Sequence, residues 1–145
     1  MTKNYTKFKI FPKKYDKFYY DVCIFKDKVS MRKFSTELFP AMGKHRFEAA
    51  THSFKAYKTV KGKEQLSDMI GTVLFYKGGF GVGVVAHEIA HAANYYFVNR
   101  GDGISMVDKT DKDWLTNDEN YALCIGYMNN QFWKKCGFKP GKERY

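Results

Sequence analysis

The residues best suited to chemistry form one five-residue motif, His87-Glu88-Ile89-Ala90-His91. Two histidines four positions apart share one face of an α-helix, so both imidazoles can bind one zinc ion at about 2.1 Å. Glu88 is rotated by about 100° from His87, which leaves its carboxylate free to take a proton from a water at the metal. The motif therefore predicts metal-assisted hydrolysis with His87 and His91 as ligands and Glu88 as the general base.

A hydrolytic zinc keeps three protein ligands and one open position, so a third ligand must come from elsewhere in the chain. Glu119 is the favoured candidate because it begins a second predicted helix whose same face is small or apolar. Those positions are Ala122, Leu123 and Gly126. Asp118 is the nearest alternative, and three more residues stay open: His45, His52 and Asp113. We expect one zinc ion per chain, although such a ligand set accepts other divalent metals.

Two helices must position these residues. Residues 81–99 carry apolar side chains at spacings of three, four and seven, which predicts a helix around the motif. Residues 100–117 are rich in glycine and aspartate and predict a loop. A second helix is predicted over 118–133, with Asn117 as its N-cap.

The first half of the chain predicts the rest of an α+β domain. β-forming residues predict strands at 18–25 and 66–76, and a weaker pattern predicts another at 47–57. Ser30 is the expected N-cap of a short helix that ends at Leu38, and Lys61-Gly62-Lys63 predicts a turn. Residues 1–15 are polar and lysine-rich and predict a basic arm packed loosely on the domain.

Length and composition are those of one folded domain spanning residues 1–145. The hydrophobic fraction is 44% and the aromatic fraction 18%, well above those of a disordered chain. No apolar run reaches the roughly 18 residues that cross a bilayer, and the N-terminus lacks a signal-peptide core. We therefore expect an intracellular protein without a membrane partner. Cys23, Cys124 and Cys136 are odd in number and widely spaced, which predicts reduced, structural thiols.

The net charge of +10 belongs to the first part of the chain. In residues 1–63, lysine and arginine outnumber aspartate and glutamate by 16 to 5, whereas the counts from residue 64 onward are 9 and 10. Such an excess favours nucleic acid or an acidic partner through salt-sensitive attraction, or it forms a solvated surface.

The motif and the segment Asn117-Asp118-Glu119-Asn120-Tyr121-Ala122 resemble the gluzincin branch of zincin metallopeptidases. A closer resemblance is to small metallopeptidase-like proteins encoded by phages and prophages, over most of residues 18–133. The resemblance implies a small zincin-like α+β domain with a mixed or antiparallel sheet, an HExxH helix and a second helix carrying the Glu119 ligand. It also implies a protein or peptide substrate and, for a phage-encoded protein, the host cytoplasm.

In zincins the strand before the motif helix commonly forms the sheet edge and pairs with an extended substrate. By that resemblance the matching segment here is 69–76, with Thr72, Leu74 and Tyr76 as substrate-binding candidates. The developing oxyanion needs a further donor, and Tyr121, Tyr127 and Tyr76 are candidates. A core role for these tyrosines is the alternative.

Two other functions compete with a peptidase. In the first, zinc only stabilises the fold of a binding protein, and Glu88 is dispensable. In the second, the basic residues recruit a protease to nucleic acid, in a way similar to SprT-like proteases, with lysines and aromatics of residues 5–26 stacking on single strands.

Overall fold

The computed structural model describes residues 5–40, 47–99 and 114–139, with side chains described throughout these ranges except at 98–99 and 114–118. Within them the chain forms three α-helices, a four-stranded mixed sheet and a separate hairpin. Helices and strands are largely segregated along the chain, so the predicted α+β class is confirmed.

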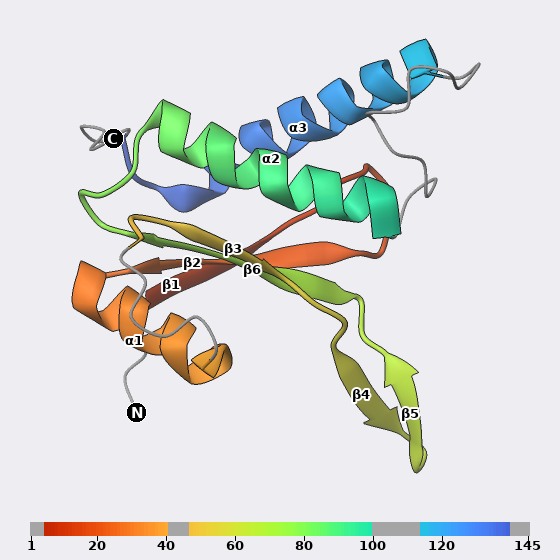
Figure 1. The fold of residues 1–145 in the computed structure, drawn as a ribbon, viewed down its shortest axis with the longest axis horizontal. Coiled ribbons are helices and arrows are strands. Elements are labelled where there is room, and N and C mark those ends of the chain that lie inside the picture. The colour runs from red at the N-terminus through yellow and green to blue at the C-terminus, as the bar shows by residue number, and fades with distance from the viewer. Residues whose placement is uncertain (1–4, 41–46, 100–113, 140–145) are drawn as a thin grey trace.

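The main sheet has the spatial order β1-β2-β6-β3 (Figure 1). Its strands are β1 (Tyr5–Ile10), β2 (Tyr19–Phe25), β6 (Met69–Tyr76) and β3 (Ala50–Ser53). The central strands β2 and β6 are parallel, while β1 pairs with β2 and β3 pairs with β6 in antiparallel fashion. The sheet is therefore mixed, and β3 is the outer strand next to β6.

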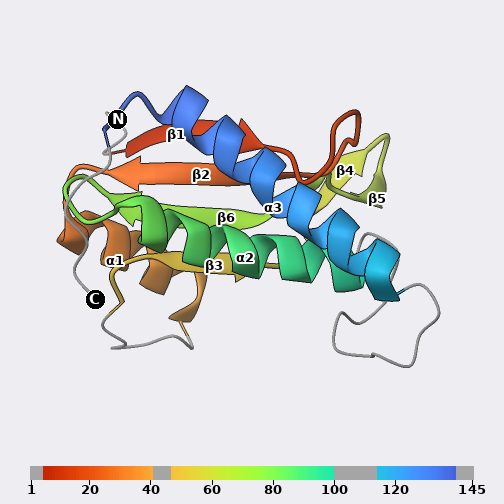
Figure 2. The ribbon, with the colours of Figure 1, turned by 90° about the horizontal axis from the view of Figure 1, so that it is seen from above.

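Helices cover both faces of this sheet (Figures 1 and 2). Helix α1 (Lys28–Leu38) packs on one face, and α2 (Val82–Asn99) and α3 (Trp114–Cys136) pack on the other. Alternation along the central strands divides the side chains between two cores. Val73 and Phe75 of β6 belong to the core beneath α2 and α3, whereas Leu74 and Tyr76 belong to the core with Met31 of α1.

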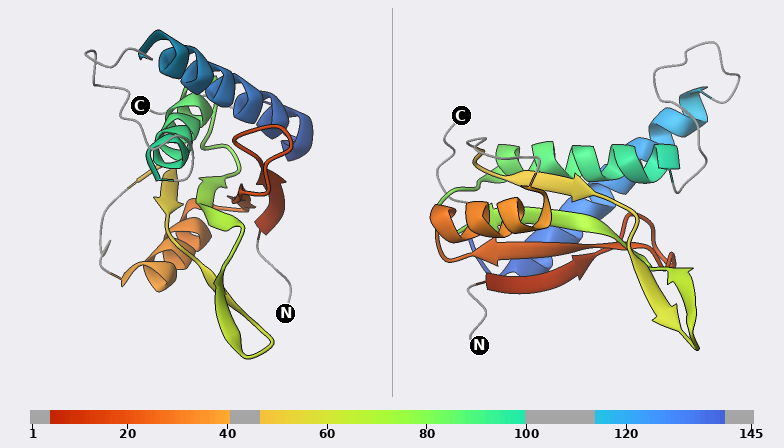
Figure 3. Two further views of the ribbon diagram at one scale, coloured as in Figure 1. Left: turned by 90° about the vertical axis from the view of Figure 1, so that its right-hand side faces the viewer. Right: turned by 60° about the horizontal axis from the view of Figure 1, so that its bottom comes forward.

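The hairpin of β4 (Tyr57–Val60) and β5 (Lys63–Leu66) projects away from the main sheet (Figure 3). All eight strand residues are exposed. The turn falls at Lys61 and Gly62, whose φ angles are 51° and 77°, and this confirms the predicted turn.

Three local predictions need correction. Residues 5–10 form the strand β1 rather than a loose arm, because Phe8 and Ile10 point inward while the lysines between and before them face solvent. Helix α1 begins after Asp27, whose carboxylate accepts the backbone N–H of Ser30 at 2.7 Å, so Asp27 and not Ser30 is the N-cap. Helix α3 begins at Trp114, inside the segment predicted as loop, and residues 100–113 of that loop lie outside the described residues.

Three other elements follow the sequence closely, whereas the hairpin strands β4 and β5 were not predicted. The structure has β2 at Tyr19–Phe25, β6 at Met69–Tyr76 and α2 at Val82–Asn99. None of the three cysteines forms a disulfide, and all three are buried, as expected for structural thiols.

Candidate metal centre

The two motif histidines lie one turn apart on the outer surface of α2. Their Nε2 atoms are 3.2 Å apart, and the ring planes meet at 80°. Two nitrogens at this separation, each about 2.1 Å from a shared ion, would subtend an angle of about 100°, close to a tetrahedral angle. The pair His87 and His91 therefore fits a single zinc ion without rearrangement of the helix.

Helix α2 is fixed against the sheet by its apolar face and by one polar contact. Val85, Ile89 and Ala92 are fully buried in the core beneath the helix. The Tyr20 hydroxyl of β2 lies 3.1 Å from the Ala92 carbonyl oxygen and 2.8 Å from the Ser53 hydroxyl of β3. Since Tyr20 has one hydroxyl proton to donate to Ala92, it accepts from Ser53. This chain of hydrogen bonds joins α2 to β3.

Glu88 points from α2 toward β3 and is only 6% exposed. The Thr51 hydroxyl of β3 lies 2.6 Å from Glu88 Oε2 and 3.0 Å from the Glu88 backbone oxygen. The hydroxyl proton is best placed for the closer carboxylate oxygen. Because a buried carboxylate without a partner is costly, this bond holds Glu88 in one orientation beside the histidines.

A cavity of about 370 Å³ opens between α2 and β3. It is lined by Phe47, residues 49–53, Glu88 and His91. One histidine and the buried carboxylate of the motif therefore face the same space as the outer strand of the sheet. A substrate in this cavity would contact both.

The segment that enters β3 is held by a charged cluster on the α1 side. The Tyr76 hydroxyl donates to Glu48, Lys28 Nζ lies 3.0 Å from the Glu48 carboxylate, and Arg32 donates to the Phe47 carbonyl oxygen at 3.2 Å. The Tyr76 hydrogen bond, with smaller contributions from the two cations, lowers the pKa of Glu48. Phe47, at the cavity wall, is therefore anchored.

The third ligand is not brought to the histidine pair by the described residues. Among them, no His, Cys, Asp or Glu joins His87 and His91 in a group of three. Glu119 lies in α3 with its side chain exposed to solvent. Asp118 is in the same helix, but its side chain is outside the described part, as are His45 and Asp113 entirely.

His52, another sequence candidate for the metal, points away from it. Its Nε2 atom lies 2.8 Å from Ser35 Oγ of α1, and its ring stacks on Phe39 at 4.2 Å. Burial lowers the pKa of this imidazole. His52 thus belongs to the α1 face of β3, opposite Thr51, and is not a ligand of the motif site.

The predicted substrate strand also needs correction. Strand β6 is not an edge, because it is paired with β2 on one side and with β3 on the other. Thr72, Leu74 and Tyr76 alternate toward the α1 face, where Leu74 and Tyr76 are buried in the core with Met31. None of these three side chains faces the histidines, and β3 takes the outer place that the sequence assigned to β6.

The oxyanion candidates likewise lie elsewhere. The Tyr121 hydroxyl donates to the Ala90 carbonyl oxygen at 3.2 Å, and burial raises the pKa of that hydroxyl. Tyr127 lines a different cavity, and Tyr76 donates to Glu48. The cavity beside the histidines contains none of them.

Thr51 is the site residue that sequence reasoning missed. It stands 37 positions before Glu88, in a short strand that the sequence indicates only weakly. The single local signal is the alternation in Ala50-Thr51-His52-Ser53, which puts Thr51 and Ser53 on one face. Nothing in that pattern names Glu88 as the partner.

Comparison with known protein families, with characterised proteins and with solved structures found no match. Within the described residues, no helix has both the length and the apolar character needed to span a membrane.

Proposed function

We propose that this protein is a zinc-dependent metallopeptidase that cleaves peptide bonds at the HExxH helix. The observation that carries the proposal is the arrangement of three motif side chains. His87 and His91 present Nε2 atoms at a spacing suited to one ion, and Glu88 is held by Thr51 in the cavity that His91 also lines. The proposal is supported by an α+β domain in which a mixed sheet carries the motif helix on one face.

In the proposed reaction, the zinc ion, Glu88 and Thr51 have different roles. A bound zinc ion would polarise the scissile carbonyl and lower the pKa of the attacking water to about 7. Glu88 would accept the proton of that water and deliver it to the leaving amine. Thr51 would keep the carboxylate aimed at the water throughout, because its hydroxyl is 2.6 Å from Oε2.

An extended peptide would pair with the outer edge of β3. Phe54 N–H donates to the Ile70 oxygen at 3.0 Å, so Phe54–Ile70 and, two residues earlier, His52–Thr72 are hydrogen-bonded pairs. Thr51 and Ser53 therefore turn their backbone groups outward. No strand of the described ranges pairs with that edge, and strand addition there would place a substrate along the cavity.

For the third ligand we retain Glu119, with Asp118 as the alternative. Both belong to the first part of α3, and this part of the helix approaches α2 where Tyr121 bonds Ala90. A carboxylate from either position would complete a set of two imidazoles and one carboxylate. The exposed side chain of Glu119 is free to change rotamer toward the pair.

Metal content per chain tests the site directly. Wild type purified without added metal should carry about one zinc, and His91→Ala should carry almost none. His52→Ala is the matched control, because that histidine lies on the same strand as Thr51 but faces α1, and it should keep the metal. Glu119→Ala and Asp118→Ala, measured in parallel, identify the third ligand.

Peptide hydrolysis then separates an enzyme from a zinc-stabilised binding protein. Wild type should cleave a mixed peptide library that Glu88→Gln leaves intact, with equal zinc in both proteins. A wild-type protein that is folded but contains no zinc would disprove the proposed metal site. Equal zinc with no cleavage by wild type would instead leave a structural metal and overturn the peptidase.

A further inference from the structure

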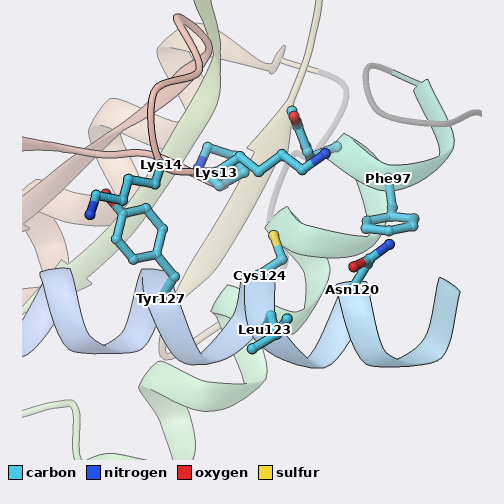
Figure 4. Close-up of a pocket in the computed structure, with 9 residues that line it drawn as sticks. Lys13, Lys14, Phe97, Asn120, Leu123, Cys124 and Tyr127 are labelled. Atoms are coloured by element: carbon cyan, nitrogen blue, oxygen red, sulfur yellow. The ribbon is translucent and has the colours of Figure 1, made fainter. Parts of the chain in front are cut away.

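A second cavity, of about 260 Å³, lies on the other side of α2 (Figure 4). Phe97 lines it, and Phe97 follows Glu88 by nine residues, which on a helix at about 100° per residue turns the two side chains in opposite directions. The wall opposite α2 and α3 is the β1–β2 turn, with Pro12, Lys13 and Lys14. This space is separate from the histidine site.

The turn over this cavity is pinned at two points. At its foot the buried Gln131 amide donates to the Phe11 carbonyl oxygen at 2.8 Å and accepts the Phe11 N–H at 2.9 Å. Nearer its tip the Tyr96 hydroxyl of α2 donates to the Asp16 carboxylate. Because the turn is tied to α3 at its foot and to α2 nearer its tip, the space between the turn and the two helices is built into the fold.

The lining is mostly apolar. Cys124 and Tyr127 of α3 form the floor, Leu123 and Asn120 of the same helix lie at its rim, and Phe97 and Tyr96 of α2 close one side. Figure 4 shows the Cys124 sulfur pointing from α3 into the space beneath Lys13. Burial raises the pKa of this thiol to about 12, so it is a neutral, apolar wall at physiological pH.

Two lysines lie at the solvent-exposed opening of this apolar cavity. The residues Lys13 and Lys14 are both exposed and both line the cavity. The Lys13 ammonium lowers the pKa of the Cys124 thiol, against the larger effect of burial. Its positive charge therefore acts on the bottom of the cavity. An occupant matched to this cavity has an apolar body and one anionic end.

We propose that this cavity binds a medium-chain aliphatic carboxylate, with its tail against Phe97, Leu123 and Cys124 and its carboxylate at Lys13 and Lys14. At about 30 Å³ per water-sized group, the space holds eight or nine such groups, the size of octanoate. A bare inorganic anion would leave the apolar walls unused, and a neutral alkane would make no contact with the charge of Lys13. The proposal does not depend on the metal site.

Calorimetric titration of the full chain with butanoate, hexanoate, octanoate and octan-1-ol tests it. Each added methylene should strengthen binding about fourfold, from about 0.8 kcal/mol per buried methylene, so octanoate, with four more methylenes, should bind about 200-fold more tightly than butanoate. Octan-1-ol should bind about fivefold more weakly than octanoate, because it lacks the charge. Equal affinity for the four compounds would overturn the proposal.

Two variants locate the site. Lys13→Ala with Lys14→Ala should weaken octanoate binding about fivefold and leave octan-1-ol unchanged, whereas the matched control Lys33→Ala with Lys58→Ala should change neither. Leu123→Trp fills the rim of the cavity from a position that is 61% exposed, so folding should persist while both compounds are lost. Octanoate affinity that is the same in Leu123→Trp as in wild type would place binding elsewhere and refute this site.

Discussion

The two cavities beside α2 differ in where their charged groups lie. On the β3 side, Glu88 is 6% exposed and is held by the Thr51 hydroxyl. On the α3 side, the walls are apolar and the charges of Lys13 and Lys14 stay at the solvent edge. A single helix thus faces a polar, oriented space on one side and an apolar space on the other.

The difference lies in the neighbours rather than in the helix. A buried carboxylate is tolerated beside β3 because a hydroxyl on the strand satisfies it. On the α3 side, Phe97 of α2 lines the cavity together with Leu123 and Cys124 of α3. The first arrangement suits chemistry that needs a fixed charge, and the second suits recognition of an apolar body.

The largest expected effect is on the β3-side cavity alone. Glu88→Gln should lower the rate of peptide cleavage by about 10³-fold, since removal of a general base costs about 10² to 10⁴ in rate. Octanoate affinity should be unchanged, because the second cavity lies on the opposite side of α2. Turnover followed by mass spectrometry and calorimetry on the same preparations checks both, and a joint loss would show that the cavities are not independent.

Thr51→Val should lower turnover by about 10- to 100-fold, the range for groups that orient a site residue. The isosteric change removes the hydroxyl that contacts Glu88 and keeps the β-branched shape of the strand residue. Thr51→Ser restores the hydroxyl and should recover most of the rate, with zinc content constant in all three proteins. If the valine and serine variants are equally impaired, Thr51 acts through packing and not through its hydrogen bond.

Gln131→Leu addresses the apolar side. It removes both bonds to Phe11 and leaves that backbone N–H and oxygen to find other partners, so the free energy of unfolding should fall by about 2 kcal/mol. Urea denaturation measures this, and octanoate should bind more weakly because the turn is less firmly held. Zinc content should stay at the wild-type value, and a drop in zinc would argue against separate regions.

The smallest effect concerns His52, behind the polar cavity. Burial lowers its pKa below the ordinary 6.5, so below about pH 6.5 the unfolded chain binds more protons at this residue than the folded chain does. The contribution of His52 to the free energy of unfolding is therefore most favourable above about pH 6.5. It decreases as the pH falls toward the depressed pKa of His52.

His52→Gln removes this titration. The difference in unfolding free energy between wild type and His52→Gln should shrink as the pH is lowered from 7.5 to 5.5. Chemical denaturation at the two pH values measures it. A difference that does not change with pH would mean that His52 titrates alike in the folded and unfolded chains.

The sequence by itself determined the features that depend on local spacing. The HExxH spacing and the apolar repeat of residues 81–99 predicted α2 and the pairing of its histidines, because both follow from the helical period. The β-forming runs predicted β2 and β6, because β-branched and aromatic residues favour strands. Lysines hid the alternation of β1, and the strand was missed.

Only the tertiary structure decided which elements meet. Strand order made β3 the outer strand and put Thr72, Leu74 and Tyr76 on the face away from α2, and neither result can be read from one strand's own sequence. The contact of Thr51 with Glu88 spans 37 residues, and Gln131 reaches Phe11 across 120. Such contacts depend on how whole elements pack, and local periodicity carries no information about partners so far away in the chain.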